Sequence, residues 1–302
     1  MAVFERGWLS SNNLLIPAAT DEPGATLIDA SHVKHAEQTV ALLRHVLDGA
    51  PLARLVNTHL HSDHCGGNAA IQRHFGAQLF IPPGQADVIM AWEASQPAFD
   101  GTGQYMERFR HDVLLEPGTV LRAGGRRFEV LPAPGHDPHS VMLFDAEHGL
   151  LVSADALWEH GFGVVFPELA GEPGFDDVQA VLDAIAALPV RLVVPGHGAP
   201  FADVGAALQR ARHRLDGFRR DPLRHARHAA KVLIKYHVME EREIERAALL
   251  AWVSATPMMI ALWQRFGQAE SESPSAWADG FLNELVKAGV LALQEDVVVD
   301  VG

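Results

Sequence analysis

A short stretch rich in histidine and aspartate is the part of this 302-residue chain whose residue types point most directly to chemistry. The segment THLHSDH holds His59, His61, Asp63 and His64 and directly follows an apolar run at residues 54–57. Alternate residues of an extended segment face the same side, so His59 and His61 can bind one cation together. Asp63 and His64, at the turn that follows, can reach a second cation beside it. Imidazole and carboxylate ligands suit zinc, iron and manganese.

Three further residues of ligand type each follow an apolar run and have small neighbours. His136 stands in PGH after RFEVL, Asp155 in AD after LLVS, and His197 in GHG after RLVV. Small neighbours let the backbone approach a bound group closely. A single histidine or aspartate at a strand end is more often a capping or satisfied polar group than a metal ligand. Together with the first stretch, they supply seven ligands for two metals.

The series THLHSDH, PGH, AD and PGHG resembles the metallo-β-lactamase superfamily of hydrolases, and the resemblance covers about residues 10–200. It implies an α+β fold, a four-layer αββα sandwich with two sheets packed face to face and the site at their strand-end edge. By the family's pattern, three imidazoles would bind the first metal: His59, His61 and His136. The second metal would be bound by Asp63, His64 and His197, and Asp155 would bridge the two.

The resemblance also implies supporting residues and a mechanism. Asp29, which ends an apolar run, matches a structural acid beneath the metal loop, while Thr58 and Ser140 are expected to hydrogen-bond ligands or close the loops. A hydroxide bridging the metals would attack a carbonyl, and Asp63 would be the catalytic residue that orients it. For both positions zinc is the metal that we expect first, with iron and manganese as alternatives. The chain contains no GxSxG motif of a serine nucleophile.

The segment at residues 157–174 directly follows the expected bridging aspartate and would overhang the metals. Its aromatic and imidazole side chains are candidates for a substrate-binding wall: Trp158, His160, Phe162 and Phe166. For the two phenylalanines, a place in the core is an equal alternative.

The expected reaction is cleavage of an ester-type bond in a small molecule, in first place a thioester of the hydroxyacylglutathione type or a lactone. An aspartate at the bridging position, where antibiotic-hydrolysing zinc β-lactamases typically have cysteine, disfavours β-lactamase activity. Two alternatives remain open at this point. One is a nuclease or phosphodiesterase that acts on RNA, and the other is a di-iron redox enzyme of the same fold.

The charge distribution bears on these alternatives. The formal net charge of −14 disfavours nucleic acid as a partner, because phosphate neutralisation dominates that affinity. Residues 208–237, however, hold nine Lys and Arg against two Asp. This basic segment could bind a phosphate or carboxylate of a thioester substrate, or nucleic acid together with the winged-helix-like tail. The favoured interpretation is that it packs against the acidic catalytic domain or faces solvent.

Hydrophobic periodicity predicts the elements that must position the ligands. Strands are expected at 13–17, 25–29, 54–57, 78–81, 127–131, 141–145, 150–153 and 191–195, with helices at 32–47, 68–75 and 175–188. Later helices are expected at 206–220, 222–236, 242–254, 257–266 and 274–288, followed by a β-hairpin. The pattern therefore predicts a catalytic domain at 1–217 and a mainly helical, winged-helix-like domain at 218–302.

The remaining composition narrows the setting. The single cysteine, Cys65, excludes an internal disulfide and a cysteine-rich structural zinc site. No apolar run reaches the roughly 18 residues needed to span a bilayer, and no secretory signal is recognisable at the N-terminus. We therefore expect a cytoplasmic protein without membrane partners. The C-terminal module is a candidate contact for a homodimer.

Overall fold

The computed structural model describes residues 1–92 and 100–302, which form two compact units. The first unit comprises residues 1–92 and Tyr105–Leu215, and the second comprises residues 100–104 and Asp216–Gly302. The break falls inside helix α7 (Val204–Arg220). The inclusion of residues 100–104 in the second unit is a feature that a single boundary at 217 does not anticipate.

The first sheet of the first unit has six strands in sequence order. They are β1 (Ala2–Phe4), β2 (Asn13–Ile16), β3 (Ala25–Ile28), β4 (Leu52–Val56), β5 (Gln78–Ile81) and β6 (Val113–Leu114). Strands β3 to β6 run parallel, whereas β1, β2 and β3 pair antiparallel. The connections contain η1 (Val33–His35), α1 (Ala36–Leu47), α2 (Ser62–Cys65), α3 (Asn68–Phe75), η2 (Pro83–Gln85) and α4 (Ala86–Ala91).

The second sheet has five strands in the order β11-β10-β9-β8-β7. They are β7 (Val120–Ala123), β8 (Arg126–Pro132), β9 (Val141–Asp145), β10 (Leu150–Ala154) and β11 (Leu192–Pro195). Strands β7 to β10 form an antiparallel meander, and β11 joins β10 in parallel. A parallel pair needs a crossover, which here contains α5 (Phe166–Ala170) and α6 (Phe175–Ala187).

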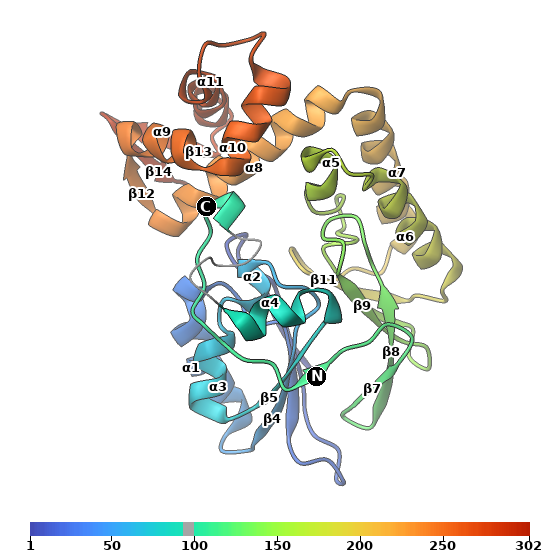
Figure 1. Cartoon of the computed structure of the whole chain (residues 1–302). Helices are drawn as coiled ribbons and strands as arrows, with labels where there is room; N and C mark the ends of the chain where they lie inside the picture. Colours follow the sequence, from blue (N-terminus) through green and yellow to red (C-terminus); the bar gives the residue numbers. More distant parts are fainter. Residues whose placement is uncertain (93–99) are drawn as a thin grey trace. The chain divides into compact units, whose positions relative to one another are not determined.

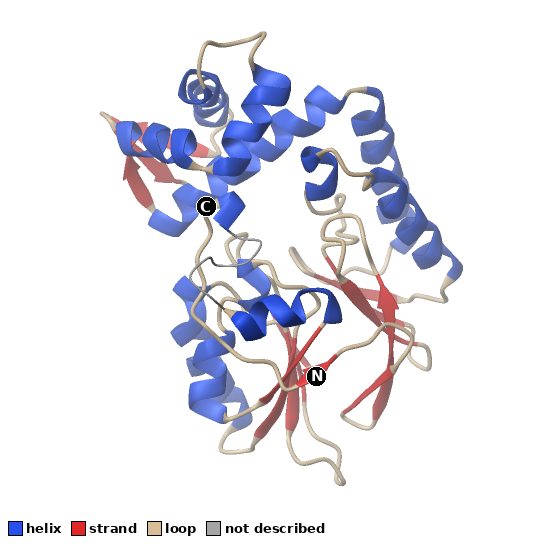
Figure 2. Ribbon diagram, in the orientation of Figure 1, coloured by secondary structure: helices blue, strands red, loops and turns tan. Residues whose placement is uncertain are grey.

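The two sheets pack face to face with helices on their outer sides (Figures 1 and 2). Both sheets contribute buried side chains to one core, among them Leu14, Ile28, Val56, Phe128, Val130, Leu143, Val152 and Val194. All residues of β9 and β10 are buried, because one face of the sheet meets the other sheet and the opposite face is covered. The expected α+β sandwich is confirmed.

This topology brings particular loops to one edge. Strands β8 and β10 are both antiparallel to β9 and therefore point the same way, and β11 is parallel to β10. The loops that follow these three strands hold His136, Asp155 and His197 and so leave the sheet at the same edge. The loop after β4 of the other sheet and the short helix α2 that follows it hold the segment from Thr58 to His64.

The second unit contains helices and a three-stranded sheet of order β12-β14-β13. Its elements are η3 (Asp100–Thr102), α8 (Pro222–Glu241), β12 (Glu243–Glu245), α9 (Arg246–Ala255), α10 (Pro257–Leu262), the π-helical η4 (Trp263–Gly267), α11 (Pro274–Lys287), β13 (Leu291–Gln294) and β14 (Val297–Asp300). The helix expected over 242–254 begins only at Arg246, because Glu243–Glu245 pairs with β14. The winged-helix-like assignment remains a prediction.

Within the described residues, no single helix is long and apolar enough to cross a membrane. One helix pair, Arg246–Ala255 with Pro257–Gly267, meets the length and composition criteria together, but it is bent by 76°.

Candidate metal centre

Three imidazoles meet between the loops after β4 and β8. His61 Nδ1 lies 3.1 Å from His59 Nε2 and 2.7 Å from His136 Nε2. His136 Nδ1 lies 2.6 Å from the carbonyl oxygen of Val164 and must donate its hydrogen there. The lone pair of His136 Nε2 therefore faces His61 Nδ1. This one nitrogen cannot donate a hydrogen bond both to His136 and to His59. A cation that accepts these lone pairs resolves the conflict, so the donor set fits a metal.

The electrostatics of this first group also favour a metal. Burial lowers the pKa of His61 and of His136 to about 4. Burial, together with the neighbouring imidazoles, lowers the pKa of His59 well below its usual value. All three rings are therefore neutral at physiological pH, and a neutral imidazole is the form that binds a metal.

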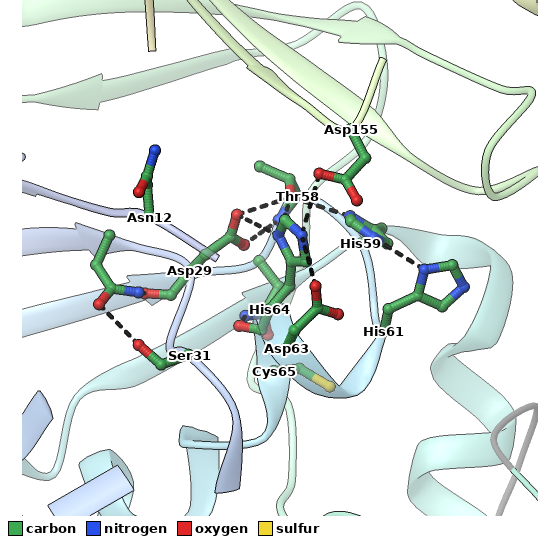
Figure 3. A network of polar contacts seen from close by, with 12 residues as sticks. Asn12, Asp29, Ser31, Thr58, His59, His61, Asp63, His64, Cys65 and Asp155 are labelled. Carbon is green, nitrogen blue, oxygen red and sulfur yellow. Dashed lines mark hydrogen bonds and ion pairs between the residues drawn. The ribbon is translucent and has the colours of Figure 1, made fainter. Parts of the chain in front are cut away.

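A second group consists of two carboxylates and two imidazoles, all buried: Asp63, His64, Asp155 and His197. Their ligand atoms lie within 4.8 Å of one another. His197 Nε2 is 2.9 Å from Asp63 Oδ2, and His64 Nε2 is 3.7 Å from the same oxygen. His64 Nε2 is buried and has no hydrogen-bond partner among the described residues, although carboxylates surround it. A buried nitrogen without a partner, aimed at carboxylates, fits a cation ligand (Figure 3).

Charge in the second group is concentrated on its carboxylates. Burial alone would raise the pKa of Asp63, but His64 and His197 hold it at about 2. The same imidazoles hold the pKa of Asp155 well below its usual range against the effect of burial. Burial would lower the pKa of His64, yet the charges of Asp29, Asp155 and Asp63 raise it well above its usual value. A divalent cation would therefore replace a proton on His64.

Asp155 lies between the two groups. Its Oδ2 is 3.4 Å from His136 Nε2 of the first group, and its Oδ1 is 3.4 Å from His64 Nε2 of the second. One carboxylate thus offers one oxygen to each group.

Unusual backbone conformations support this arrangement. Asp29 at the end of β3 and Ala154 at the end of β10 have φ of 59° and 46°, in the left-handed region that most residues avoid. Position 196 needs glycine in this arrangement, because a Cβ there would lie 2.1 Å from Asp155 Oδ1. Beyond His61 the chain turns, as the sequence predicts. A helical turn, α2, begins at Ser62 and brings Asp63 and His64 to the second group.

The expected supporting residues lie around these groups in different ways. Asp29 accepts hydrogen bonds from the N–H and the hydroxyl of Thr58, both at 2.9 Å, and lies 2.8 Å from His64 Nδ1. Ser140 does not reach a ligand with its hydroxyl, which is buried and has no partner among the described residues. Its main chain closes the loop instead, because its N–H donates to Asp137 and its carbonyl accepts from Ala133.

The four candidates for the substrate wall separate into two pairs. The ring of Phe166 lies 5.3 Å from that of His61, and the Trp158 indole donates to Asp155 Oδ1 at 3.1 Å. Phe162 is buried beneath the guanidinium of Arg214. The side chain of His160 is 79% exposed and lies 3.8 Å from Glu159 in an ion pair, so it points to solvent.

Two residues at the groups are not indicated by any motif. Trp8 stacks on His197 at 5.3 Å between ring centroids, and the buried carboxylate of Asp137 lies 3.8 Å from His61 Nε2. Asp137 directly follows the PGH motif, which is a signal that could have found it. Nothing in the sequence links Trp8 to His197.

Several basic side chains of residues 208–237 form ion pairs or hydrogen bonds within the chain. In the first unit, Arg212 pairs with Asp183 at 2.7 Å, and Arg210 donates to the carbonyl of Glu159. In the second unit, the ion pairs are Arg227 with Glu270 and Glu284, Lys231 with Glu284, and Lys235 with Asp300. These contacts agree with a packing role for these side chains.

A family model described as the metallo-beta-lactamase superfamily matches residues 6–197. Similar curated proteins include a hydroxyacylglutathione hydrolase from Anaeromyxobacter dehalogenans, 31% identical over 170 residues, or 56% of this chain and 57% of the relative. Another, from Chelativorans sp., is 28% identical over 164 residues, or 54% of this chain and 55% of the relative. The chain therefore spans about half the length of these relatives.

Two solved structures are also similar. A beta-lactamase domain protein from Burkholderia ambifaria has a TM-score of 0.58 and 21% identity, over 98% of this chain and 90% of that chain. TTHA1623 in a di-iron-bound form has a TM-score of 0.55 and 25% identity, over 70% of this chain and all (100%) of that chain. The first of these similarities concerns the fold alone.

Proposed function

The chain belongs to the metallo-beta-lactamase superfamily, and from this membership we propose that it is a metal-dependent hydrolase that cleaves an ester-type bond. The observation that carries the proposal is the position of Asp155, which offers one oxygen to each of two ligand groups. A shared carboxylate between two adjacent groups suits a pair of metals that act on one substrate.

We expect the first metal to be held by His59, His61 and His136, and the second by Asp63, His64 and His197, with Asp155 shared. Two bound divalent metals would make water a nucleophile near neutral pH and polarise the carbonyl under attack. Zinc is our first expectation for the metal. The ligand types also suit iron and manganese, and the similarity to TTHA1623 in a di-iron-bound form supports testing iron.

The protein's own residues would position the reactants. Asp63 remains ionised because the pKa of its carboxyl is about 2, so it can accept a hydrogen bond from the attacking water and orient it. Trp158 holds one oxygen of Asp155 through its indole N–H. Phe166 lies 5.3 Å from the ring of His61 and 5.6 Å from that of His136, and it shields the first group from bulk water.

For the substrate we propose a thioester first and a lactone second, both small molecules. The curated relatives named as hydroxyacylglutathione hydrolases support the thioester. Because that similarity covers about half of each chain, the acyl and thiol parts must be identified by experiment. A cytoplasmic location and a homodimer formed through the second unit remain predictions from the sequence.

A substrate panel tests the proposal. Protein loaded with zinc, iron or manganese is given a hydroxyacylglutathione, a lactone, a phosphodiester and RNA. We expect hydrolysis of the thioester or the lactone with at least one metal. Cleavage of RNA that weakens steeply with salt, without any ester hydrolysis, would overturn the proposal in favour of a nuclease.

A further inference from the structure

An exposed tryptophan outside every motif lies at the second ligand group. The ring of Trp8 is nearly parallel to that of His197, with 5.3 Å between centroids and 12° between planes. The indole of Trp158 meets both rings edge-on, at 5.4 Å from Trp8 and 5.3 Å from His197. We call Trp8, Trp158 and His197 the aromatic corner.

The position of Trp8 is built into the fold. The loop that carries it is tied to the two loops that hold Asp63 and His197. Ser11 N–H donates to the carbonyl of Asp63 at 3.0 Å, and Asn12 N–H donates to that of Gly196 at 2.7 Å. The side-chain amide of Asn12 donates to two further carbonyls near His197, at 3.0 and 2.7 Å. The main chain that follows Trp8 is therefore fixed beside the second group.

Trp158 is held just as firmly. Its indole N–H donates to Asp155 Oδ1, and its main-chain N–H donates to Gly161 at 2.7 Å. Arg210 donates to the carbonyl of the next residue, Glu159, at 2.7 Å. This arginine braces the loop that carries Trp158.

The exposure of the corner indicates what it can bind. Trp8 is 55% exposed, although its ring already covers His197, so a large apolar surface faces solvent. A rigid, exposed indole suits a planar apolar group.

We propose that Trp8 and Trp158 form a specificity subsite for an aromatic group on the acyl side of the substrate. The inference rests on the proposed ester-type hydrolysis and specifies the class of substrate. Aromatic rings stack on an indole face in offset or edge-on geometry, and Trp8 and Trp158 present both a face and an edge.

Selectivity between matched substrates tests the subsite. Two thioesters of the same thiol are compared, one phenylacetyl and one propionyl. We expect the wild type to prefer the phenylacetyl substrate and Trp8→Ala to lower the ratio of the two kcat/KM values about tenfold, while Trp8→Phe recovers most of it. Tyr105→Ala is the matched control, because Tyr105 is an aromatic residue of equal exposure, 56%, and should leave the ratio unchanged.

A binding measurement separates this inference from the proposed function. Calorimetry with phenylacetate and acetate on the metal-loaded protein needs no turnover, and Trp8→Ala should weaken phenylacetate alone. Preferential, Trp8-dependent binding of phenylacetate without hydrolysis of any ester would support the subsite and reject the hydrolase. Two results would overturn the proposed subsite. One is an equal loss of kcat/KM for both thioesters in Trp8→Ala together with loss of metal, and the other is a wild type that does not prefer the phenylacetyl substrate.

Discussion

His64 Nδ1 lies 2.8 Å from Asp29 Oδ2, and this contact aims the other ring nitrogen of His64 at Asp63 and Asp155 (Figure 3). Both partners are buried, and Thr58 holds the same carboxylate through two hydrogen bonds. A carboxylate behind a ligand histidine fixes the orientation of its ring and raises its basicity. We therefore infer that Asp29 positions His64 within the second ligand group.

Asp29→Asn should weaken binding of the second metal by about 10- to 100-fold and spare the first, because the amide lacks the charge and one acceptor. Titration of the metal-free protein with metal measures the dissociation constants of both sites and the number of metals bound. Asp145→Asn is the control, because Asp145 is an equally buried carboxylate that pairs with Arg126 and His148. Unchanged affinity for the second metal in Asp29→Asn would contradict the positioning role.

The affinity for the second metal should rise with pH, and that for the first should not. The carboxylates around His64 raise its pKa against the effect of burial, so the metal-free protein holds a proton there that the metal must displace. His61 and His136, with pKa values of about 4, are already neutral. Between about pH 6 and 8 we expect about a tenfold rise per pH unit for the second site alone. Calorimetry in buffers of different ionisation enthalpy counts the released proton, and equal pH dependence at both sites would refute this account.

Gly196→Ala should abolish binding of the second metal, because the new Cβ would lie 2.1 Å from Asp155 Oδ1 and displace that carboxylate. Metal content after dialysis measures the loss. Gly205→Ala is the control, since the nearest atom to its Cβ would be 4.0 Å away. Two retained metals in Gly196→Ala would show that Asp155 is not held as described.

His61→Ala should lower kcat/KM for the best ester substrate at least about a hundredfold and leave the fold intact, because the side chain is at the edge of the first group. Circular dichroism checks the fold. His74→Ala, a partly exposed histidine that pairs with Glu37, should stay within about twofold of the wild type. Full activity of His61→Ala would contradict the assignment of His61 as a metal ligand.

Most of the sandwich could be predicted from the sequence because its buried strands are continuous apolar runs. Strands such as β9 and β10 are covered on both faces. Their sequences, VMLFD and LLVSA, are mostly apolar, which is typical of buried strands and not of surface loops. Short edge strands carry no such pattern, so β1, β6 and the charged β12 were not predictable by periodicity.

The site divides in the same way. Ligand-type residues at strand ends were recognisable because the topology places such ends at one edge. The helical form of the turn at Ser62–Cys65 was not, because three polar residues and a cysteine after a strand read equally well as a loop. The contact of Trp8 with His197 depends on the hydrogen bonds of Asn12 to a distant loop, which no local pattern encodes.

The most direct test of the account is the number of transition metals bound per chain. After reconstitution with zinc or iron and removal of excess metal, elemental analysis against protein concentration should give two per chain, one for each ligand group. A ratio of one or none would contradict the dinuclear centre on which the proposed hydrolysis depends.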